Sequence, residues 1–153
     1  ESVLALVEQS VADNHHYGHQ RAVTLQLSAA AGAEVWHIQI DKLRFAQIMA
    51  NLISNAVKFS PTQSSVQITL QRQQQQAKIL VQDQGPGIPD EFKSLIFQRF
   101  SQADSSDARQ KGGTGLGLAL SKQLTESMGG CIGFDSVLGQ GASFYLWFDL
   151  LDT

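Results

Sequence analysis

Three polar side chains inside an apolar segment, Asn51, Asn55 and Lys58, have the spacing of a ligand site. On a helix this spacing puts all three on one face. Asparagine is a poor helix former in mid-helix, and a local preference that is broken twice within one turn is expected at functional sites. Amide oxygens suit a hydrated Mg²⁺, and a neighbouring lysine supplies positive charge for a phosphate. A polar stripe that faces solvent is the alternative, and these residues alone do not decide.

A second candidate site is the stretch from Asp83 to Pro89, which follows an apolar run over 77–81. An acidic residue at the end of a strand, followed by glycine and proline, predicts a strand that stops and turns sharply. Glycine lets a ligand approach the backbone closely, and proline stiffens the turn. A carboxylate held there can accept a hydrogen bond from an exocyclic amine. An ordinary loop between a strand and a helix is the alternative on this stretch alone.

A third candidate is the glycine-rich stretch 112–118, which leads into a helix expected over 119–128. Glycines before a helix suit a phosphate, because free N–H groups and the helix dipole both point at it. The stretch lacks the Gly-Lys-Ser/Thr end of a Walker A loop, and its third glycine comes one residue too early for a dinucleotide fingerprint. The preceding segment, 101–111, has few large apolar residues to bury, so we expect it to be mobile.

The remaining elements follow from hydrophobic periodicity. Apolar spacing predicts a helix over 1–12, which the histidine-containing stretch 14–19 breaks. A solvated helix end is favoured there over a metal site, because no cysteine or acidic ligand is interleaved. Asp41 is expected to cap a long helix that runs to Phe59 and ends at Ser60-Pro61. Strands are predicted over 23–27, 35–40, 66–70, 77–81, 131–137 and 142–150, with His37 on an exposed face and a hairpin turn at 73–76.

Composition narrows the class of protein. The chain has 153 residues, of which 42% are hydrophobic and 16% are charged, as expected for one globular domain. The net charge of -3 argues against a general nucleic-acid binder. Cys131 is the single cysteine, so no internal disulfide can form, and a reducing compartment is consistent with this composition. Its side chain is predicted to be a small buried packing residue rather than a reactive thiol. No apolar run approaches the roughly 20 residues of a membrane span, and no signal peptide is recognised. Because the chain begins inside an expected helix, we expect an excised fragment.

Taken in order, the motifs resemble those of the catalytic and ATP-binding domain of bacterial sensor histidine kinases, of the GHKL or Bergerat type. Residues 51–59 resemble the N box and residues 83–87 the G1 box. Residues 97–100 resemble the F box, residues 113–118 the G2 box, and residues 139–144 are similar to the last glycine motif. The wider superfamily includes the ATPase domains of gyrase, Hsp90 and MutL. The continuation after the F box is similar to hybrid sensor kinases, which carry a receiver domain.

The resemblance implies an α+β two-layer sandwich. Its mixed, mostly antiparallel five-stranded sheet is covered on one face by about three helices, with a mobile ATP lid at about 102–113. Residues 1–22 would be an N-terminal helix and connection from a missing dimerisation domain, and residues 23–153 the catalytic domain. The parent kinase would be anchored in the inner membrane with this domain in the cytoplasm.

The resemblance also implies roles for single residues. Asp83 would accept a hydrogen bond from the adenine amine, Asn55 would coordinate Mg²⁺ with Asn51 beside it, and Lys58 would contact phosphate; these last three are the expected catalytic residues. The further ATP-binding residues implied are Phe59, Gly85, Gly87, Ile88, Phe97, Arg99, Arg109, Lys111, Gly113, Thr114, Gly115, Leu116, Gly117, Leu118 and Ser143. Many family members carry an arginine near the position of Gln102, so the cation that meets the γ-phosphate is left open between Arg99, Arg109 and Lys111.

The predicted function is transfer of the γ-phosphate of Mg-ATP to a histidine on a separate dimerisation domain, leaving ADP. None of the four histidines of the chain is followed by the glutamate or aspartate that the family places after its phospho-accepting histidine. Gyrase-like relatives have a glutamate base where this chain has Asn51, and an amide cannot take a proton from water, so ATP hydrolysis should be slow. The expected partners are the dimerisation domain and a response regulator or receiver domain, with no nucleic acid, and the fragment itself is expected to be a monomer. The main alternative is a non-catalytic nucleotide-binding module; a protein-serine kinase or a gyrase-type or MutL-type ATPase is less favoured.

Overall fold

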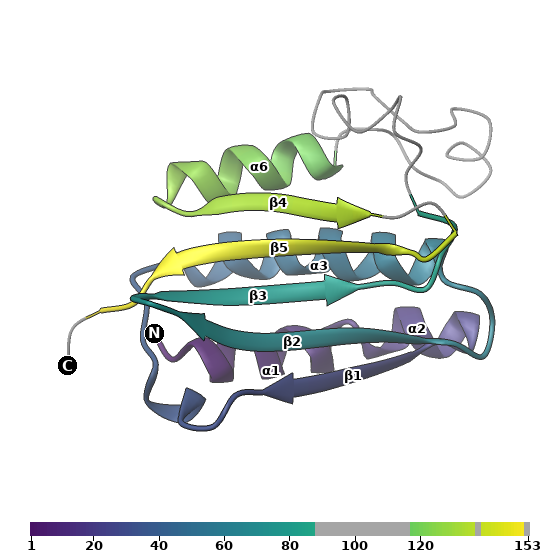
Figure 1. Cartoon of the computed structure of the whole chain (residues 1–153), viewed down its shortest axis with the longest axis horizontal. Helices are drawn as coiled ribbons and strands as arrows, with labels where there is room; N and C mark the ends of the chain where they lie inside the picture. The colour runs from purple at the N-terminus through teal and green to yellow at the C-terminus, as the bar shows by residue number, and fades with distance from the viewer. Residues whose placement is uncertain (88–116, 137–138, 152–153) are drawn as a thin grey trace.

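The fold is built on one five-stranded sheet. The computed structural model describes residues 1–87, 117–136 and 139–151. The strands are β1 (Thr24–Ala29), β2 (Ser65–Gln73), β3 (Gln76–Gln82), β4 (Cys131–Ser136) and β5 (Ala142–Asp149). Their order is β1-β2-β3-β5-β4, in which β1 and β2 are parallel and every other neighbouring pair is antiparallel (Figure 1). The predicted mixed, mostly antiparallel five-stranded sheet is therefore confirmed.

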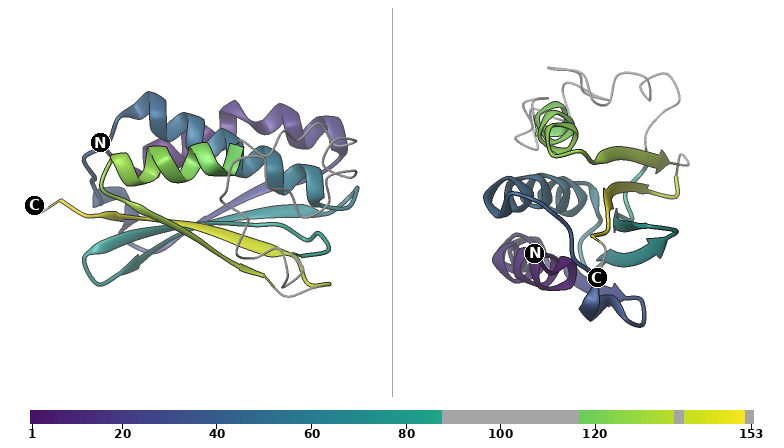
Figure 2. Two further views of the ribbon diagram at one scale, coloured as in Figure 1. Left: turned by 90° about the horizontal axis from the view of Figure 1, so that it is seen from above. Right: turned by 90° about the vertical axis from the view of Figure 1, so that its left-hand side faces the viewer.

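Helices cover one face of this sheet, as Figure 2 shows. They are α1 (Val3–Asp13), α2 (His15–Arg21), α3 (Lys42–Phe59) and α6 (Gly117–Ser127), with a short 3-10 turn, η1 (Ala33–Val35). Helix α3 lies between α1 and α6 and contacts both. On the other face of the sheet the described residues place no helix, so the fold is the predicted two-layer α+β sandwich.

The core lies between α3 and the middle strands. Apolar and polar residues alternate along β2, β3 and β5, so one row of side chains in each strand points to the helices and is buried. The fully buried side chains include Ile68, Ile79 and Leu146 from the sheet and Ile48 and Leu52 from α3. Each such side chain stabilises the fold by about 1.5–3 kcal/mol relative to an exposed position. Because one face of α3 packs on the sheet, the opposite face remains as the candidate for ligand binding.

The expected boundaries of α3 are confirmed. Asp41 is its N-cap, and its Oδ1 accepts hydrogen bonds from the backbone N–H groups of Leu43 and Arg44 at 2.9 and 3.2 Å. The helix ends at Phe59, one residue before the Ser60-Pro61 stop. The hairpin between β2 and β3 and the helix before β4 also lie where they were predicted.

The predicted strand over 35–40 is wrong. Val35 is the last residue of η1, and the residues after it do not join the sheet. Trp36 and Ile38 are buried and His37 is exposed, so the alternation that predicted a strand is real. Its backbone groups pair instead with the two ends of the described chain: Val3 N–H donates to Trp36 O at 3.0 Å, and Leu151 N–H donates to His37 O at 2.8 Å.

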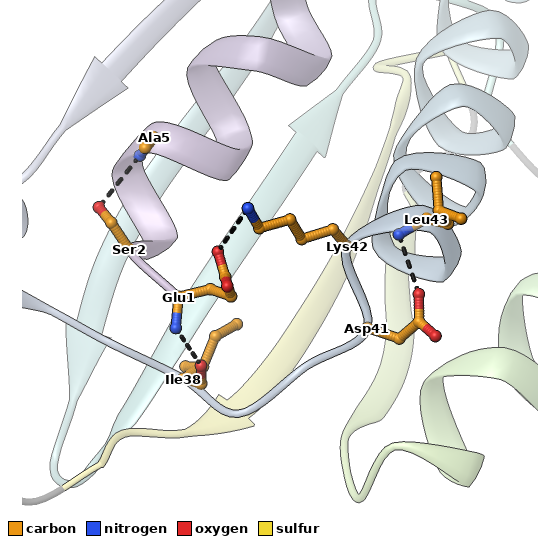
Figure 3. A network of polar contacts seen from close by, with 7 residues as sticks. All are labelled: Glu1, Ser2, Ala5, Ile38, Asp41, Lys42 and Leu43. Carbon is orange, nitrogen blue, oxygen red and sulfur yellow. Dashed lines mark hydrogen bonds and ion pairs between the residues drawn. The ribbon is translucent and has the colours of Figure 1, made fainter.

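The first residues of the chain are tied to the rest of the domain at the start of α3 (Figure 3). The Glu1 nitrogen donates to Ile38 O at 3.0 Å, and the Glu1 carboxylate lies 3.2 Å from the Lys42 amine in an exposed ion pair. Ser2 caps α1 by accepting from Ala5 N–H at 3.3 Å. Helix α1 thus packs as part of the same helical layer, and a domain boundary at residue 22 stays a prediction.

Two local interpretations were wrong. The break predicted at 14–19 is confined to Asn14, after which α2 continues over the histidine-containing stretch. The histidines of α2 are exposed, and no cluster of three metal-ligating side chains is found among the described residues. Cys131 is exposed rather than buried, because it lies opposite Trp147 on the sheet face away from the helices.

No helix in the described ranges is long and apolar enough to cross a membrane.

Candidate functional site

The first part of the site is the exposed side of α3. Asn51, Asn55 and Lys58 are all partly exposed, whereas the residues between them that face the sheet are buried. The predicted common face is therefore present. Within the described part of the chain, the Asn55 side chain makes no hydrogen bond and Lys58 forms no ion pair. No described residue therefore occupies the polar group of either side chain.

The second part is Asp83, which directly follows β3 and is only 6% exposed. Its Oδ1 accepts hydrogen bonds from the backbone N–H groups of Gly85 at 2.9 Å and Ala142 at 3.1 Å. Burial raises the pKa of Asp83 above its ordinary value of 3.8, and the two hydrogen bonds offset part of this rise. Both hydrogen bonds end on Oδ1, so no described residue donates to Oδ2. The carboxylate is thus held in place through Oδ1, with Oδ2 unoccupied by any described residue.

The turn after Asp83 packs directly on the end of α3. A Cβ added to Gly85 would lie 2.3 Å from the carbonyl oxygen of Phe59, so no larger residue fits without moving the backbone. Next to this contact, Gln84 N–H donates to Ser60 Oγ at 3.3 Å. These two contacts therefore fix the turn that carries Asp83 against the C-terminal end of α3.

The last glycine motif supports Asp83 from the other side. Gly141 has φ +89°, and a Cβ there would lie 2.4 Å from the carbonyl oxygen of Asp83. The carbonyl oxygen of the next residue, Ala142, accepts a hydrogen bond from the Asp83 backbone N–H at 2.9 Å. The Ala142 N–H in turn donates to the Asp83 side chain. Sequence reasoning singled out the glycines but missed Ala142 N–H as a donor, because a backbone donor leaves no trace in residue type.

The third part is α6, which packs beside α3. The Asn51 Nδ2 donates to Ser121 Oγ at 3.2 Å, and Ser121 is fully buried. Sequence reasoning missed Ser121; a polar residue on the core side of the α6 sequence was the available signal. Leu118, near the start of α6, packs partly buried against the core.

The other predicted residues fall into four groups. Phe59 is 38% exposed at the end of α3, and Gly87 has φ +81° in the turn after Asp83, so both lie near the group already described. Ser143 is not brought to it: it alternates with the buried Ala142 and Phe144 and lies on the sheet face away from the helices. Gly117 is the first residue of α6. The predicted residues outside the described ranges are Ile88, Phe97, Arg99, Arg109, Lys111, Gly113, Thr114, Gly115 and Leu116, and the whole of the expected lid at 102–113 also lies outside them.

Comparison with known proteins bears on this arrangement. Residues 40–152 match the model of the family described as histidine kinase-, DNA gyrase B- and HSP90-like ATPase. The circadian input-output histidine kinase CikA of Synechococcus elongatus is 44% identical over 125 residues, which cover 82% of this chain and 17% of that protein. Hybrid signal transduction histidine kinase D of Dictyostelium discoideum is 37% identical over 131 residues, which cover 82% of this chain and 8% of that protein. The chain thus spans a small part of these relatives.

A solved structure has the same fold over nearly the whole chain. The crystal structure of full-length ShkA in complex with AMPPNP superposes with a TM-score of 0.82 at 29% identity, covering 97% of this chain and 30% of ShkA. The shared fold includes the sheet and the helical layer that position Asp83 and the exposed side of α3.

Proposed function

The chain belongs to the family of histidine kinase-, DNA gyrase B- and HSP90-like ATPases, and from this premise we propose that it is the ATP-binding catalytic domain of a sensor histidine kinase. In this role it transfers the γ-phosphate of Mg-ATP to a histidine on a separate dimerisation domain and releases ADP. The observation that carries the proposal is the buried Asp83 carboxylate, fixed next to the C-terminal end of α3.

Asp83 recognises the base in this proposal. Its Oδ1 is already occupied by two backbone donors, and Oδ2 is left to accept a hydrogen bond from the exocyclic amine of adenine. A hydrogen bond to a charged acceptor is worth about 1.5–3 kcal/mol, more than a neutral one. Guanine carries an oxygen at the equivalent ring position, and two acceptors facing each other repel. The site should therefore prefer adenine nucleotides.

The polar face of α3 serves the phosphates and Mg²⁺. Its donor set fits this ion, since amide oxygens are hard ligands and Mg²⁺ keeps several of its waters rather than filling an all-protein cage. Asn55 would be the ligand, with Asn51 beside it, and Lys58 would contact a phosphate oxygen. When bound, Mg²⁺ neutralises charge on the phosphate oxygens during transfer.

Asn51 favours phosphoryl transfer over hydrolysis. A carboxamide cannot accept a proton from water, so the chain lacks a general base at the position where gyrase-like relatives carry a glutamate. ATP is then held until an imidazole of the dimerisation domain attacks the γ-phosphorus in line with the leaving ADP oxygen. The proposed partners are the dimerisation domain and a receiver domain or response regulator. The proposed location of the catalytic domain is the cytoplasm, as part of a parent kinase that is anchored in the membrane.

Phosphorylation in trans tests the proposed function. The chain is mixed with the histidine-containing dimerisation domain of its own parent protein and with Mg-ATP labelled on the γ-phosphate. We expect acid-labile label on that domain, lost with Asn55→Ala and kept with the exposed control Ser127→Ala. ATP binding without any label transfer would instead identify a non-catalytic nucleotide-binding module.

A further inference from the structure

We infer that Ser121 is a positioning residue, which holds the Asn51 carboxamide in the orientation that the Mg-nucleotide requires. This inference rests on the proposed function, because it concerns the same site. It starts from a contact between α3 and α6, made by two residues that lie 70 positions apart in the chain: Asn51 Nδ2 donates to Ser121 Oγ at 3.2 Å.

The burial of Ser121 strengthens its contact with Asn51. Ser121 is fully buried, whereas Asn51 is only partly buried, so the bond joins the exposed face of α3 to the interior of the α3–α6 interface. A buried hydroxyl cannot exchange its partner for bulk water, and a buried polar group without a partner is costly. The pair is therefore held together more firmly than two exposed polar side chains would be.

The planar geometry of a carboxamide carries the effect to the ligand. Its nitrogen and oxygen are fixed in one plane, so anchoring Nδ2 on α6 also limits the directions in which Oδ1 can point. Preorganised polar groups avoid the cost of being ordered when the ligand arrives. Asn55, one turn further along α3, is the expected metal ligand, and an ordered Asn51 beside it keeps the polar face in one arrangement.

Ser121 also lies close to the start of α6. The helix begins at Gly117, the last glycine of the glycine-rich stretch, and Ser121 follows one turn later. Helices α3 and α6 lie side by side (Figure 2), and the Asn51–Ser121 bond ties the start of α6 to the middle of α3. Ligand contacts made near the start of α6 and on α3 should consequently depend on each other.

Thr125 provides a matched control. It is fully buried on the same side of α6, one turn beyond Ser121, and its Oγ1 donates to the backbone carbonyl of Ser121 at 2.7 Å. Both Ser121→Ala and Thr125→Val remove one buried hydroxyl and keep the side-chain volume nearly unchanged. Only Ser121→Ala removes a partner of Asn51.

The experiment measures ADP affinity of the chain by calorimetry, with saturating Mg²⁺ and again with EDTA, for the wild type and both variants. We expect Ser121→Ala to weaken binding about fivefold with Mg²⁺, the size of one net hydrogen bond, and to have little effect in EDTA. Thr125→Val should match the wild type under both conditions. The melting temperature of each variant is recorded, so that a loss of folding is not counted as a loss of binding.

A double-mutant cycle adds a second readout. If Ser121 acts through Asn51, Ser121→Ala should cost no further affinity in an Asn51→Ala background. Additive losses, or equal losses in Ser121→Ala and Thr125→Val, would overturn the inference while leaving nucleotide binding by the wild type intact. Absence of ADP binding by the wild type would instead refute the proposed function, and the inference with it.

Discussion

Gly139 and Gly141 form a matched pair that tests how the Asp83 carboxylate is supported. Both have positive φ, +85° and +89°, a backbone conformation that side chains with a Cβ rarely adopt. They differ in their surroundings: a Cβ at Gly139 meets nothing within 4 Å, whereas a Cβ at Gly141 lies 2.4 Å from the carbonyl oxygen of Asp83. Replacing each by alanine therefore separates backbone strain from a collision with Asp83.

The magnitudes follow from these two terms. Left-handed backbone costs alanine roughly 1–2 kcal/mol, which both variants share. The collision at Gly141 forces a backbone shift, for which overpacking studies give about 1–3 kcal/mol more. We expect Gly141→Ala to lose about 2–5 kcal/mol of unfolding free energy, out of a total of about 5–15 kcal/mol for a domain, so it should still fold. The shift also displaces Ala142 N–H from Asp83, so ADP affinity should fall with it.

Urea denaturation followed by circular dichroism gives the unfolding free energy of each variant, and ADP titration gives its affinity. Gly139→Ala should lose only the strain term and keep ADP binding. Equal losses of stability in the two variants, or full ADP affinity in Gly141→Ala, would refute the account of how Asp83 is positioned.

Three further predictions concern pH, a helix cap and the core. Because burial raises the pKa of Asp83 above 3.8, we expect ADP affinity in calorimetry to fall as acidification protonates this carboxylate, at a pH where an exposed aspartate is still ionised. Over the same pH range the contribution of Asp83 to the free energy of unfolding should decrease as pH rises through its raised pKa, because the folded state binds the proton more tightly than the unfolded state. The urea midpoint of the wild type should therefore fall relative to that of Asp83→Asn as pH rises, and a constant difference between the two midpoints would contradict this prediction. Asp41→Ala should lower the unfolding free energy by about 0.5–2 kcal/mol through loss of the α3 cap, and an unchanged urea midpoint would contradict the cap. Leu146→Ala, at a fully buried position, should cost about 2–5 kcal/mol in urea denaturation, against little change for Leu43→Ala at 83% exposure, and similar costs would argue against the core described above.

The fold could be predicted from the sequence where a local pattern and its tertiary role agree. The alternation in β2, β3 and β5 has one buried face, and the cap, apolar spacing and stop of α3 all lie within the helix itself. The segment 35–40 shows the limit of such patterns. It alternates like a strand, but whether its backbone joins a sheet depends on partners far away in the sequence, here Val3 and Leu151.

The site was predictable to a similar degree. The shared face of Asn51, Asn55 and Lys58 follows from helical spacing alone. The contact of Asn51 with Ser121 could not be predicted, because it needs the packing of two helices that are distant in sequence. Exposure of Cys131 was missed for a related reason: an apolar neighbourhood in sequence does not tell which face of the sheet a strand residue occupies.

Calorimetric titration of the wild type and Asp83→Asn with ADP and Mg²⁺ tests the central claim most directly. The substitution keeps the shape of the side chain but replaces the charged acceptor. The account predicts saturable binding to the wild type, lost or strongly weakened in Asp83→Asn, while both proteins unfold cooperatively. Equal binding by the two proteins, or none by a folded wild type, would contradict the assignment of Asp83 as the adenine contact.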